Sequence, residues 1–136
     1  MNKNILAVGL NPVMQKTILL EHLWENEVNR SSRYYFTVAG KGANTARVLT
    51  ELGAEVMHLT HAGGNYEQMF RSMLEHDHIN LYAVDSGSEI RLCYTLINGE
   101  KHTVTEIVEE AVPVQPQTDR CIRQEYQNLL DSAHIV

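Results

Sequence analysis

The residues best suited to bind a ligand lie in a glycine-rich turn that leads directly into a predicted helix. Residues 39–44 read Ala-Gly-Lys-Gly-Ala-Asn, and the helical pattern that follows ends at Gly53, where glycine often follows a helix. Gly40 and Gly42 let the backbone approach a ligand closely. The free N–H groups at a helix start, with the cation of Lys41, favour an anionic or hydroxyl-rich ligand.

The same short pattern also occurs in strand-to-helix loops that bind nothing, so the turn alone leaves both interpretations open. It is not a P-loop, because the sequence contains no G-x-x-x-x-G-K-[ST], and the full G-x-G-x-x-G dinucleotide pattern is also absent. The ligand must therefore be inferred from the residues around the turn.

Cysteine and histidine give no comparable signal. Cys93 and Cys121 are far apart and match no metal or redox spacing, so we expect reduced thiols of a cytoplasmic protein. His76 and His78 form an H-x-H at a predicted helix end without a third ligand nearby. We therefore expect no metal site.

The composition is that of one globular domain: 136 residues, 43% hydrophobic and 21% charged. The formal net charge of −6 argues against a nucleic-acid partner, which requires a basic face. No apolar run approaches the roughly 20 residues of a membrane span, and the N-terminus lacks the apolar region of a signal peptide. We expect a cytoplasmic protein with neither nucleic-acid nor membrane partners.

The elements before the second glycine loop are predicted as follows. Residues 5–10 form an apolar run typical of a strand buried on both faces, ended by Asn11-Pro12. A short strand is expected over 17–20, and half-exposed strands over 28–36. The glycine turn then begins a helix whose apolar face is Ala43, Ala46, Leu49 and Leu52.

Strands and helices also follow one another in the second half of the sequence. Strands are expected over 55–60 and 79–84, on either side of a 61–64 loop and a helix over 66–76. Strands 90–97 and 102–108 form a hairpin through Asn98-Gly99. Thr118 or Asp119 caps a last helix, whose inward residues are Ile122, Tyr126, Leu129 and Leu130. Residues 134–136 read as the start of another buried strand, so we expect the N-terminal piece of a longer protein or a shortened gene product.

This order predicts an α/β fold with a mostly parallel sheet flanked by helices and a small antiparallel β lid. Ligands of such sheets bind at the carboxyl ends of the parallel strands. The Asn11-Pro12 loop, the glycine turn and the Gly63-Gly64 loop all lie at such ends.

Several segments together resemble one enzyme family: residues 10–12, 28–30, 39–49, 52–54, 63–64, 88–91 and 105–107. They are similar to the ribokinase/PfkB carbohydrate kinases, and within them to the phosphosugar branch of tagatose-6-phosphate kinases and 1-phosphofructokinases. The resemblance implies a ribokinase-like three-layer fold, in which residues 1–136 form the N-terminal part and the lid spans approximately 16–37 and 90–108. It also implies a phosphotransferase that moves the γ-phosphate of ATP to a hydroxyl of a phosphorylated ketohexose, such as tagatose 6-phosphate or fructose 1-phosphate.

The resemblance also assigns the substrate-binding residues. It implies that Gly40, Lys41 and Asn44 meet sugar hydroxyls, and that Arg30 and Arg91 contact the existing phosphate of the substrate from the lid. Guanidinium groups suit phosphate oxygens, although an exposed strand charge would be the ordinary interpretation of either arginine. The remaining residues of the implied site are Asn11 and Gln15.

The chain departs from the family pattern at two places. Gln15 stands where the family has an aspartate that accepts from sugar hydroxyls, so a charge-assisted bond is lost and the substrate can differ. Glu110 and Ala111 replace a small residue and a glycine, which alters the loop beside the lid.

In members of this family, the catalytic residues lie in the C-terminal half of the chain. There, the catalytic base is an aspartate in a late Gly-Ala-Gly-Asp motif, and the ATP and Mg²⁺ sites lie in the same half. The present sequence contains no such motif. We therefore expect no catalytic residue, no bound ATP or Mg²⁺, and no kinase activity in this chain alone.

Two other functions stay open. A non-catalytic, truncated sugar-phosphate-binding or dimerisation module would pair as a homodimer through its lid strands or an exposed sheet edge. An unrelated nucleotide-binding α/β domain could also carry a glycine turn.

Overall fold

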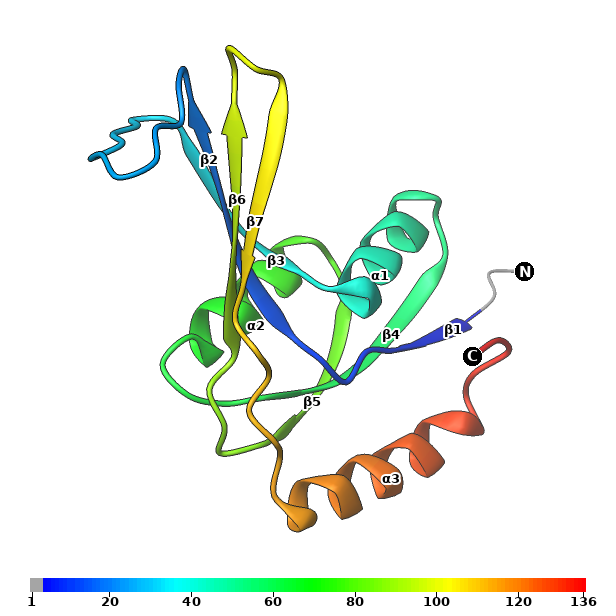
Figure 1. Ribbon diagram of the computed structural model, residues 1–136. Coiled ribbons are helices and arrows are strands. Elements are labelled where there is room, and N and C mark those ends of the chain that lie inside the picture. Colours follow the sequence, from blue (N-terminus) through cyan, green and yellow to red (C-terminus); the bar gives the residue numbers. More distant parts are fainter. Residues whose placement is uncertain (1–3) are drawn as a thin grey trace.

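The computed structural model describes residues 4–136, which form two sheets and three helices. The elements are β1 Asn4–Val8, β2 Val13–Leu20, β3 Tyr34–Ala39, α1 Lys41–Glu51, β4 Glu55–Ala62, α2 Glu67–His76, β5 Asn80–Asp85, β6 Arg91–Asn98, β7 Thr103–Val108 and α3 Pro116–Leu130. The fold is the predicted α/β arrangement with helices around a parallel sheet (Figure 1).

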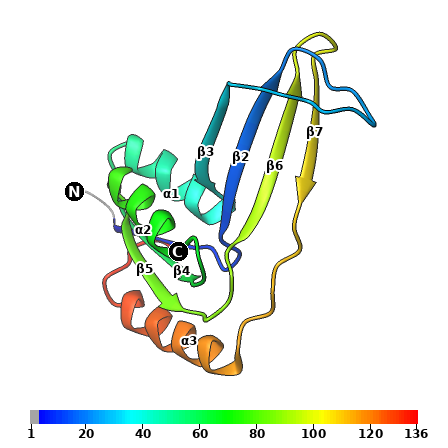
Figure 2. The ribbon, with the colours of Figure 1, turned by 90° about the vertical axis from the view of Figure 1, so that its left-hand side faces the viewer.

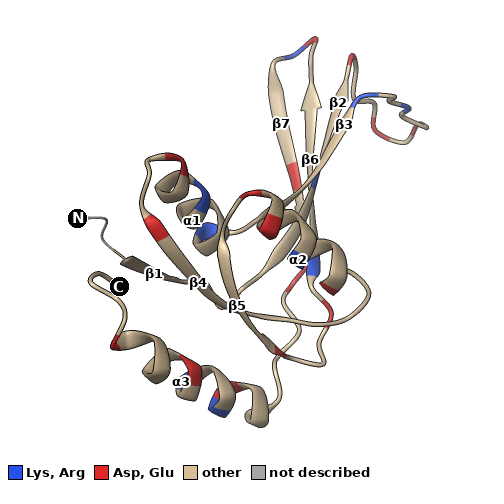
Figure 3. Ribbon diagram, turned by 180° about the vertical axis from the view of Figure 1, so that it is seen from behind, with Lys and Arg blue, Asp and Glu red and all other residues tan. Residues whose placement is uncertain are grey.

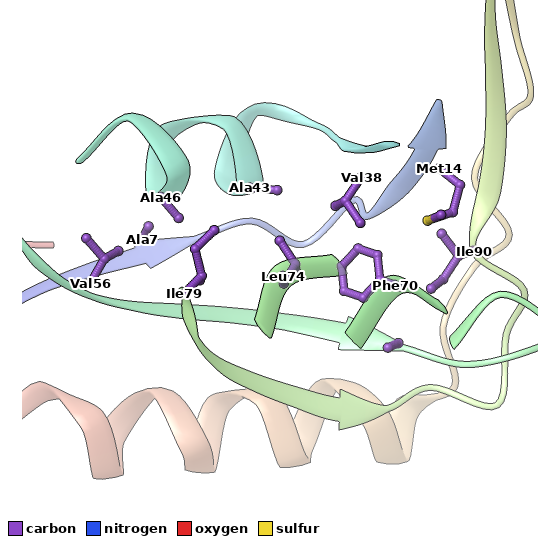
Figure 4. Close-up of a cluster of buried hydrophobic side chains, with 11 residues drawn as sticks. Ala7, Met14, Val38, Ala43, Ala46, Val56, Phe70, Leu74, Ile79 and Ile90 are labelled. Carbon is purple, nitrogen blue, oxygen red and sulfur yellow. The ribbon is translucent and has the colours of Figure 1, made fainter. Parts of the chain in front are cut away.

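The body of the molecule is a three-layer structure around a parallel sheet ordered β1-β4-β5, here called the body sheet. Helices α1 and α2 cover one face, and their apolar side chains pack with those of β1 and β4 in one core cluster (Figure 4). Helix α3 covers the opposite face, where Ile122 and Leu129 pack against Leu6, Met57 and Leu59. Alternate side chains of the strands therefore pack into two separate cores, one on each face of the body sheet, as a strand buried on both faces requires.

The second sheet, here called the lid sheet, is ordered β3-β2-β6-β7 and projects from the body (Figure 2). Its outer pairs are antiparallel, but its central pair β2 and β6 is parallel, from Val13 opposite Arg91 to Leu20 opposite Asn98. The expectation of an antiparallel lid is therefore wrong at its centre. Both central strands enter the lid from the end of the body sheet where β1 and β5 finish, so they run in the same direction.

Several predicted boundaries are corrected. β1 ends at Val8, two residues early, and β2 begins at Val13, because the segment between them turns from the body into the lid. Residues 28–33 form no strand; the Asn29 side chain instead bonds the backbone of Trp24 and Glu27, which folds the region into a compact loop. The expected hairpin is present, as β6 and β7 pair on either side of residues 99–102.

The expected cap of the last helix is wrong. α3 begins at Pro116 with Gln115 as its N-cap, and proline suits this first helical position because it has no N–H to satisfy. Thr118 lies inside the helix, buried, where its hydroxyl donates to the Asp85 carbonyl at 3.3 Å. Of the residues expected to face inward, Leu130 is exposed, as is Leu52 at the end of α1.

The last residues pair with β1 through one isolated bridge and form no strand, and Ile135 and Val136 are exposed, so the expected buried strand is not present within residues 134–136. Ile135 forms a parallel bridge with Ile5, and the Leu6 N–H donates to the Ile135 carbonyl at 2.9 Å. None of the helices that the structure describes is long and apolar enough to cross a membrane. Acidic and basic residues occur together on α3 and at the lid tip, so neither element presents charges of one sign (Figure 3).

Candidate functional site

A cleft of about 480 Å³ lies where the body sheet meets the lid sheet, and we call it the glycine cleft. Its lining residues are Val8, Gly9, Leu10, Asn11, Gly40, Lys41, Gly42 and Arg91. Four of the seven predicted site residues, Asn11, Gly40, Lys41 and Arg91, therefore meet in one place. They come from the loop after β1, the start of α1 and the start of β6.

The floor of the glycine cleft is a direct contact between two backbone segments. A Cβ atom on Gly42 would lie 2.6 Å from the Gly9 Cα, and one on Gly9 would lie 2.7 Å from the Gly42 Cα. Neither distance is possible for a real side chain, so both positions require glycine. Gly9 was missed as a site residue, because in the sequence it is only the penultimate residue of an apolar run.

The start of α1 faces the cleft without a competing acid. Gly40, the N-cap residue, has φ 96°, a conformation that favours glycine, and offers no side chain to the free N–H groups. The first turn of the helix carries no acidic residue, and Lys41 adds a cation there. This combination stabilises an anionic or hydroxyl group of a ligand.

Arg91 contributes the second cation of the cleft. Its Nη1 donates to the Glu109 carbonyl at 3.0 Å, which holds the guanidinium at the base of the lid. Its Nε is buried and has no hydrogen-bond partner among residues 4–136. A buried N–H without a partner is unusual in a folded protein, and a shift of the Arg91 side chain would let an anionic ligand atom in the cleft satisfy it.

Gln15 lies on the same face of the lid sheet as Arg91, because Val13 pairs with Arg91 and Gln15 follows two residues later. Its Nε2 donates to the Thr95 hydroxyl at 2.7 Å, and that hydroxyl donates to Glu106 at 3.4 Å. The Thr95 contact uses one of the two N–H groups of the Gln15 amide and fixes its orientation, and the amide oxygen can accept from a ligand hydroxyl.

The structure does not bring Gln15, Arg30 or Asn44 into the lining of the glycine cleft. Arg30 lies in the loop beyond the far end of β2, separated from Val13 by an eight-residue strand, or about 23 Å at about 3.3 Å per residue. Asn44 is exposed on α1, where its Oδ1 accepts from Arg47 at 3.0 Å. The Gly63-Gly64 loop also lies outside the lining of the cleft and packs against Ser86 and Ser88.

A larger groove of about 690 Å³ lies between β3, α1 and α2. The arginine that lines this groove already has hydrogen-bond and ion-pair partners within the protein. Arg47 pairs with Asp77 at 2.8 Å and also donates to Asn44 and to the Val38 carbonyl. The glycine cleft, whose arginine keeps a buried unpartnered N–H, is therefore the better candidate for an anionic ligand. Over the described part of the chain, no three His, Cys, Asp or Glu side chains gather so that they could hold a metal ion.

Comparison with known proteins identifies the family and the fold. A family model described as pfkB family carbohydrate kinase matches residues 2–136. Among solved structures, a possible 1-phosphofructokinase of Thermotoga maritima superposes with a TM-score of 0.90 at 22% identity, covering 97% of this chain and 43% of that one.

Two structures of phosphofructokinase-2 from Escherichia coli are also similar. The complex with fructose-6-phosphate has a TM-score of 0.86 at 17% identity, with 94% of this chain and 42% of that chain covered. The tetrameric inhibited form has a TM-score of 0.84 at 16% identity, with coverages of 94% and 42%. The chain thus spans less than half the length of the structures that it matches.

Proposed function

This chain belongs to the pfkB family of carbohydrate kinases, and from that premise we propose that it forms the acceptor side of a sugar-phosphate kinase. The ligand would be a phosphorylated ketohexose such as tagatose 6-phosphate or fructose 1-phosphate. In the complete enzyme, one hydroxyl of this sugar would receive the γ-phosphate of ATP.

The observation that carries the proposal is that Arg91, whose buried Nε has no partner among residues 4–136, lines a cleft together with Lys41 and the start of α1. A phosphate group offers several acceptor oxygens to such a set of donors. Sugar hydroxyls would meet Asn11, the Gly40 backbone and the free oxygen of Gln15. Arg30 and Asn44 stay in the proposed site on the strength of the family resemblance alone.

The residues of this chain do not fit the nucleotide half of the reaction. ATP would supply the phosphoryl group and Mg²⁺ would neutralise its charge, but the sequence contains no Gly-Ala-Gly-Asp motif and residues 4–136 contain no metal-binding cluster. The role proposed for residues 1–136 is therefore to bind and orient the sugar phosphate. The free thiols Cys93 and Cys121 support a cytoplasmic location for this role.

Calorimetric titration tests the proposal. Fructose 1-phosphate and tagatose 6-phosphate should bind more tightly than the unphosphorylated sugars. Arg91→Ala should weaken phosphosugar binding by about tenfold to a hundredfold, since hydrogen bonds to charged groups contribute about 1.5–3 kcal/mol. Arg120→Ala on the exposed face of α3 removes the same charge elsewhere and should leave affinity unchanged. Equal affinity for phosphorylated and plain sugars would contradict the proposal.

A second candidate, a non-catalytic dimerisation module, is favoured by apolar side chains exposed on the lid sheet. Tyr35, Val104 and Val108 are all more than half exposed. By strand register they share the face that carries Gln15 and Arg91. A second copy covering this face would remove them from water.

A further inference from the structure

Three side chains near the end of β4 hydrogen-bond the backbone segment that walls the glycine cleft. The Nδ1–H of His58 donates to the Ala7 carbonyl at 2.9 Å, and the Thr60 hydroxyl donates to the Gly9 carbonyl at 2.6 Å. The Nε2–H of His61 donates to the Leu10 carbonyl at 3.0 Å. Each bond joins residues 51 positions apart, so only the tertiary fold creates them.

These donors hold the segment from both faces of the body sheet. Side chains alternate along a strand, so His58 and Thr60 lie on the face of α1 and α2, and His61 lies on the face of α3. His58 also lies directly beside the glycine contact, with its Cε1 2.8 Å from where a Gly42 Cβ would be. The two carbonyls that precede Asn11 are thus bound from opposite sides.

The ladder of the body sheet does not extend to these carbonyls. The last paired residues of β1 and β4 are Val8 and Leu59, and one further backbone bond runs from the Gly9 N–H to the Leu59 carbonyl. Beyond it, the hydrogen bonds from Thr60 and His61 are those that orient the Gly9 and Leu10 carbonyls. Side chains rather than β-pairing therefore set the direction of the chain into Asn11.

Both histidines are suited to act as fixed donors. Burial lowers the pKa of His58 and of His61, so each ring is neutral at pH 7 and carries one N–H. The Nδ1 of His61 is buried without a partner among the residues described, and its Nε2 faces a carbonyl, which can only accept. The proton is therefore on Nε2, and the Leu10 carbonyl is its single recorded partner.

We propose that Thr60 and His61 are positioning residues: they hold the Gly9 and Leu10 carbonyls so that Asn11 stays in the lining of the glycine cleft with Lys41 and Arg91. The consequence for ligand binding rests on the proposed function, whereas the restraint on the loop is a property of the free chain. Because Asn11 would meet sugar hydroxyls and Arg91 the phosphate, loss of the restraint should affect the sugar more than the phosphate.

Paired variants test this. Thr60→Val and His61→Leu remove the donors, whereas Thr60→Ser keeps a hydroxyl and His61→Gln keeps an amide N–H near the place of Nε2. His76→Leu makes the same change at an exposed histidine of α2 and serves as the control. His61 is only partly buried, so we expect its variants to fold. They therefore still test the proposal if Thr60→Val does not fold.

Amide hydrogen exchange of the free protein is the first measurement. In Thr60→Val and His61→Leu, the Gly9 N–H should exchange about three- to tenfold faster, as expected for the loss of one net hydrogen bond. The Ala54 N–H, which bonds Leu49 at the end of α1, should not change. Thr60→Ser and His61→Gln should restore protection. Unchanged exchange at Gly9, or an equal rise at Gly9 and Ala54, would overturn the proposal.

Calorimetry with fructose 1-phosphate and with inorganic phosphate is the second measurement. The donor-removing variants should weaken fructose 1-phosphate binding by about three- to tenfold, and inorganic phosphate binding by less than about twofold. A parallel loss for both ligands would indicate a merely structural role. If the wild-type chain binds no phosphosugar, the proposed function fails, and the exchange comparison alone decides whether Thr60 and His61 position the loop.

Discussion

At the scale of single residues, Gly9 and Gly42 explain why the turn contains glycine. The Gly40-Lys41-Gly42 pattern was ambiguous by itself, because it also suits a loop without a ligand. The structure shows that Gly42 touches the backbone of Gly9, 33 positions earlier, and that this contact forms the floor of the cleft. Gly40 has a different role, since its positive φ turns the chain into α1.

Gly42→Ala should therefore be harmful, although alanine normally favours helices. The added Cβ would lie 2.6 Å from the Gly9 Cα and 2.8 Å from His58, so one backbone segment must move. We expect a loss of about 1–3 kcal/mol in unfolding free energy, the usual range for overpacking. Thermal or urea unfolding checks this.

The control for this change is Gly99→Ala at the lid tip. Gly99 has no positive φ, and the nearest atom to its added Cβ would be the Leu20 carbonyl at 3.3 Å. Gly99→Ala should lower the unfolding free energy less than Gly42→Ala does. An equal loss of unfolding free energy in both variants would show that the Gly9–Gly42 contact is not the cause.

At the scale of elements, the parallel pairing of β2 with β6 matters most. It places Arg91 directly opposite Val13, at the base of the lid, and so next to the loop that follows β1. It also puts Gln15 and Thr95 within 2.7 Å, through their side chains, on one face of the lid sheet. An all-antiparallel lid would have required β6 to start at the far tip, with Arg91 away from the cleft.

The lid also carries the surface expected to pair with a second copy. If it does, Val104→Glu would force a carboxylate into the interface and should convert a dimer to a monomer, because an unpaired buried charge is strongly unfavourable. Sedimentation velocity at micromolar concentrations measures this. Val112→Glu, at an equally exposed valine outside the lid strands, is the matched control. A wild-type chain that sediments as a monomer would rule out this interface.

At the scale of the whole molecule, the chain forms a three-layer body and a lid while spanning 42–43% of the length of the similar structures named above. Its cleft contains donors and cations for an anionic ligand, but the chain has no Gly-Ala-Gly-Asp motif. We therefore expect this chain to bind a sugar phosphate without transferring a phosphoryl group to it.

The corresponding prediction is that residues 1–136 alone do not phosphorylate a sugar phosphate. Transfer requires a base, a metal and a nucleotide site together, and the sequence supplies no motif for them. An assay that couples ADP formation to NADH oxidation, with fructose 1-phosphate, ATP and Mg²⁺, should show background rates. Circular dichroism and phosphosugar calorimetry on the same sample verify that the chain is folded and binding. Sustained turnover would overturn the prediction.

Much of the fold could be predicted from local patterns. Apolar runs located the strands of the body sheet, Gly53 marked the end of α1, and Asn98-Gly99 marked the hairpin, because each signal depends on residues close together in the chain. The boundaries that failed depend on distant contacts. The local sequence predicts Thr118 or Asp119 as a cap, because the hydrogen bond from Thr118 to the Asp85 carbonyl, 33 residues away, cannot be seen in the local pattern.

The glycine turn, Lys41 and Arg91 were identified from residue type and family resemblance, and the sequence by itself thus determined the chemistry available to the site. Tertiary structure decided which of these residues meet: it joined Asn11, Gly40, Lys41 and Arg91 in one cleft and left Arg30 at the far end of the lid. It also revealed Gly9, Thr60 and His61. Their roles come from backbone contacts across 33 to 51 positions, and such contacts exist only once the strands have paired.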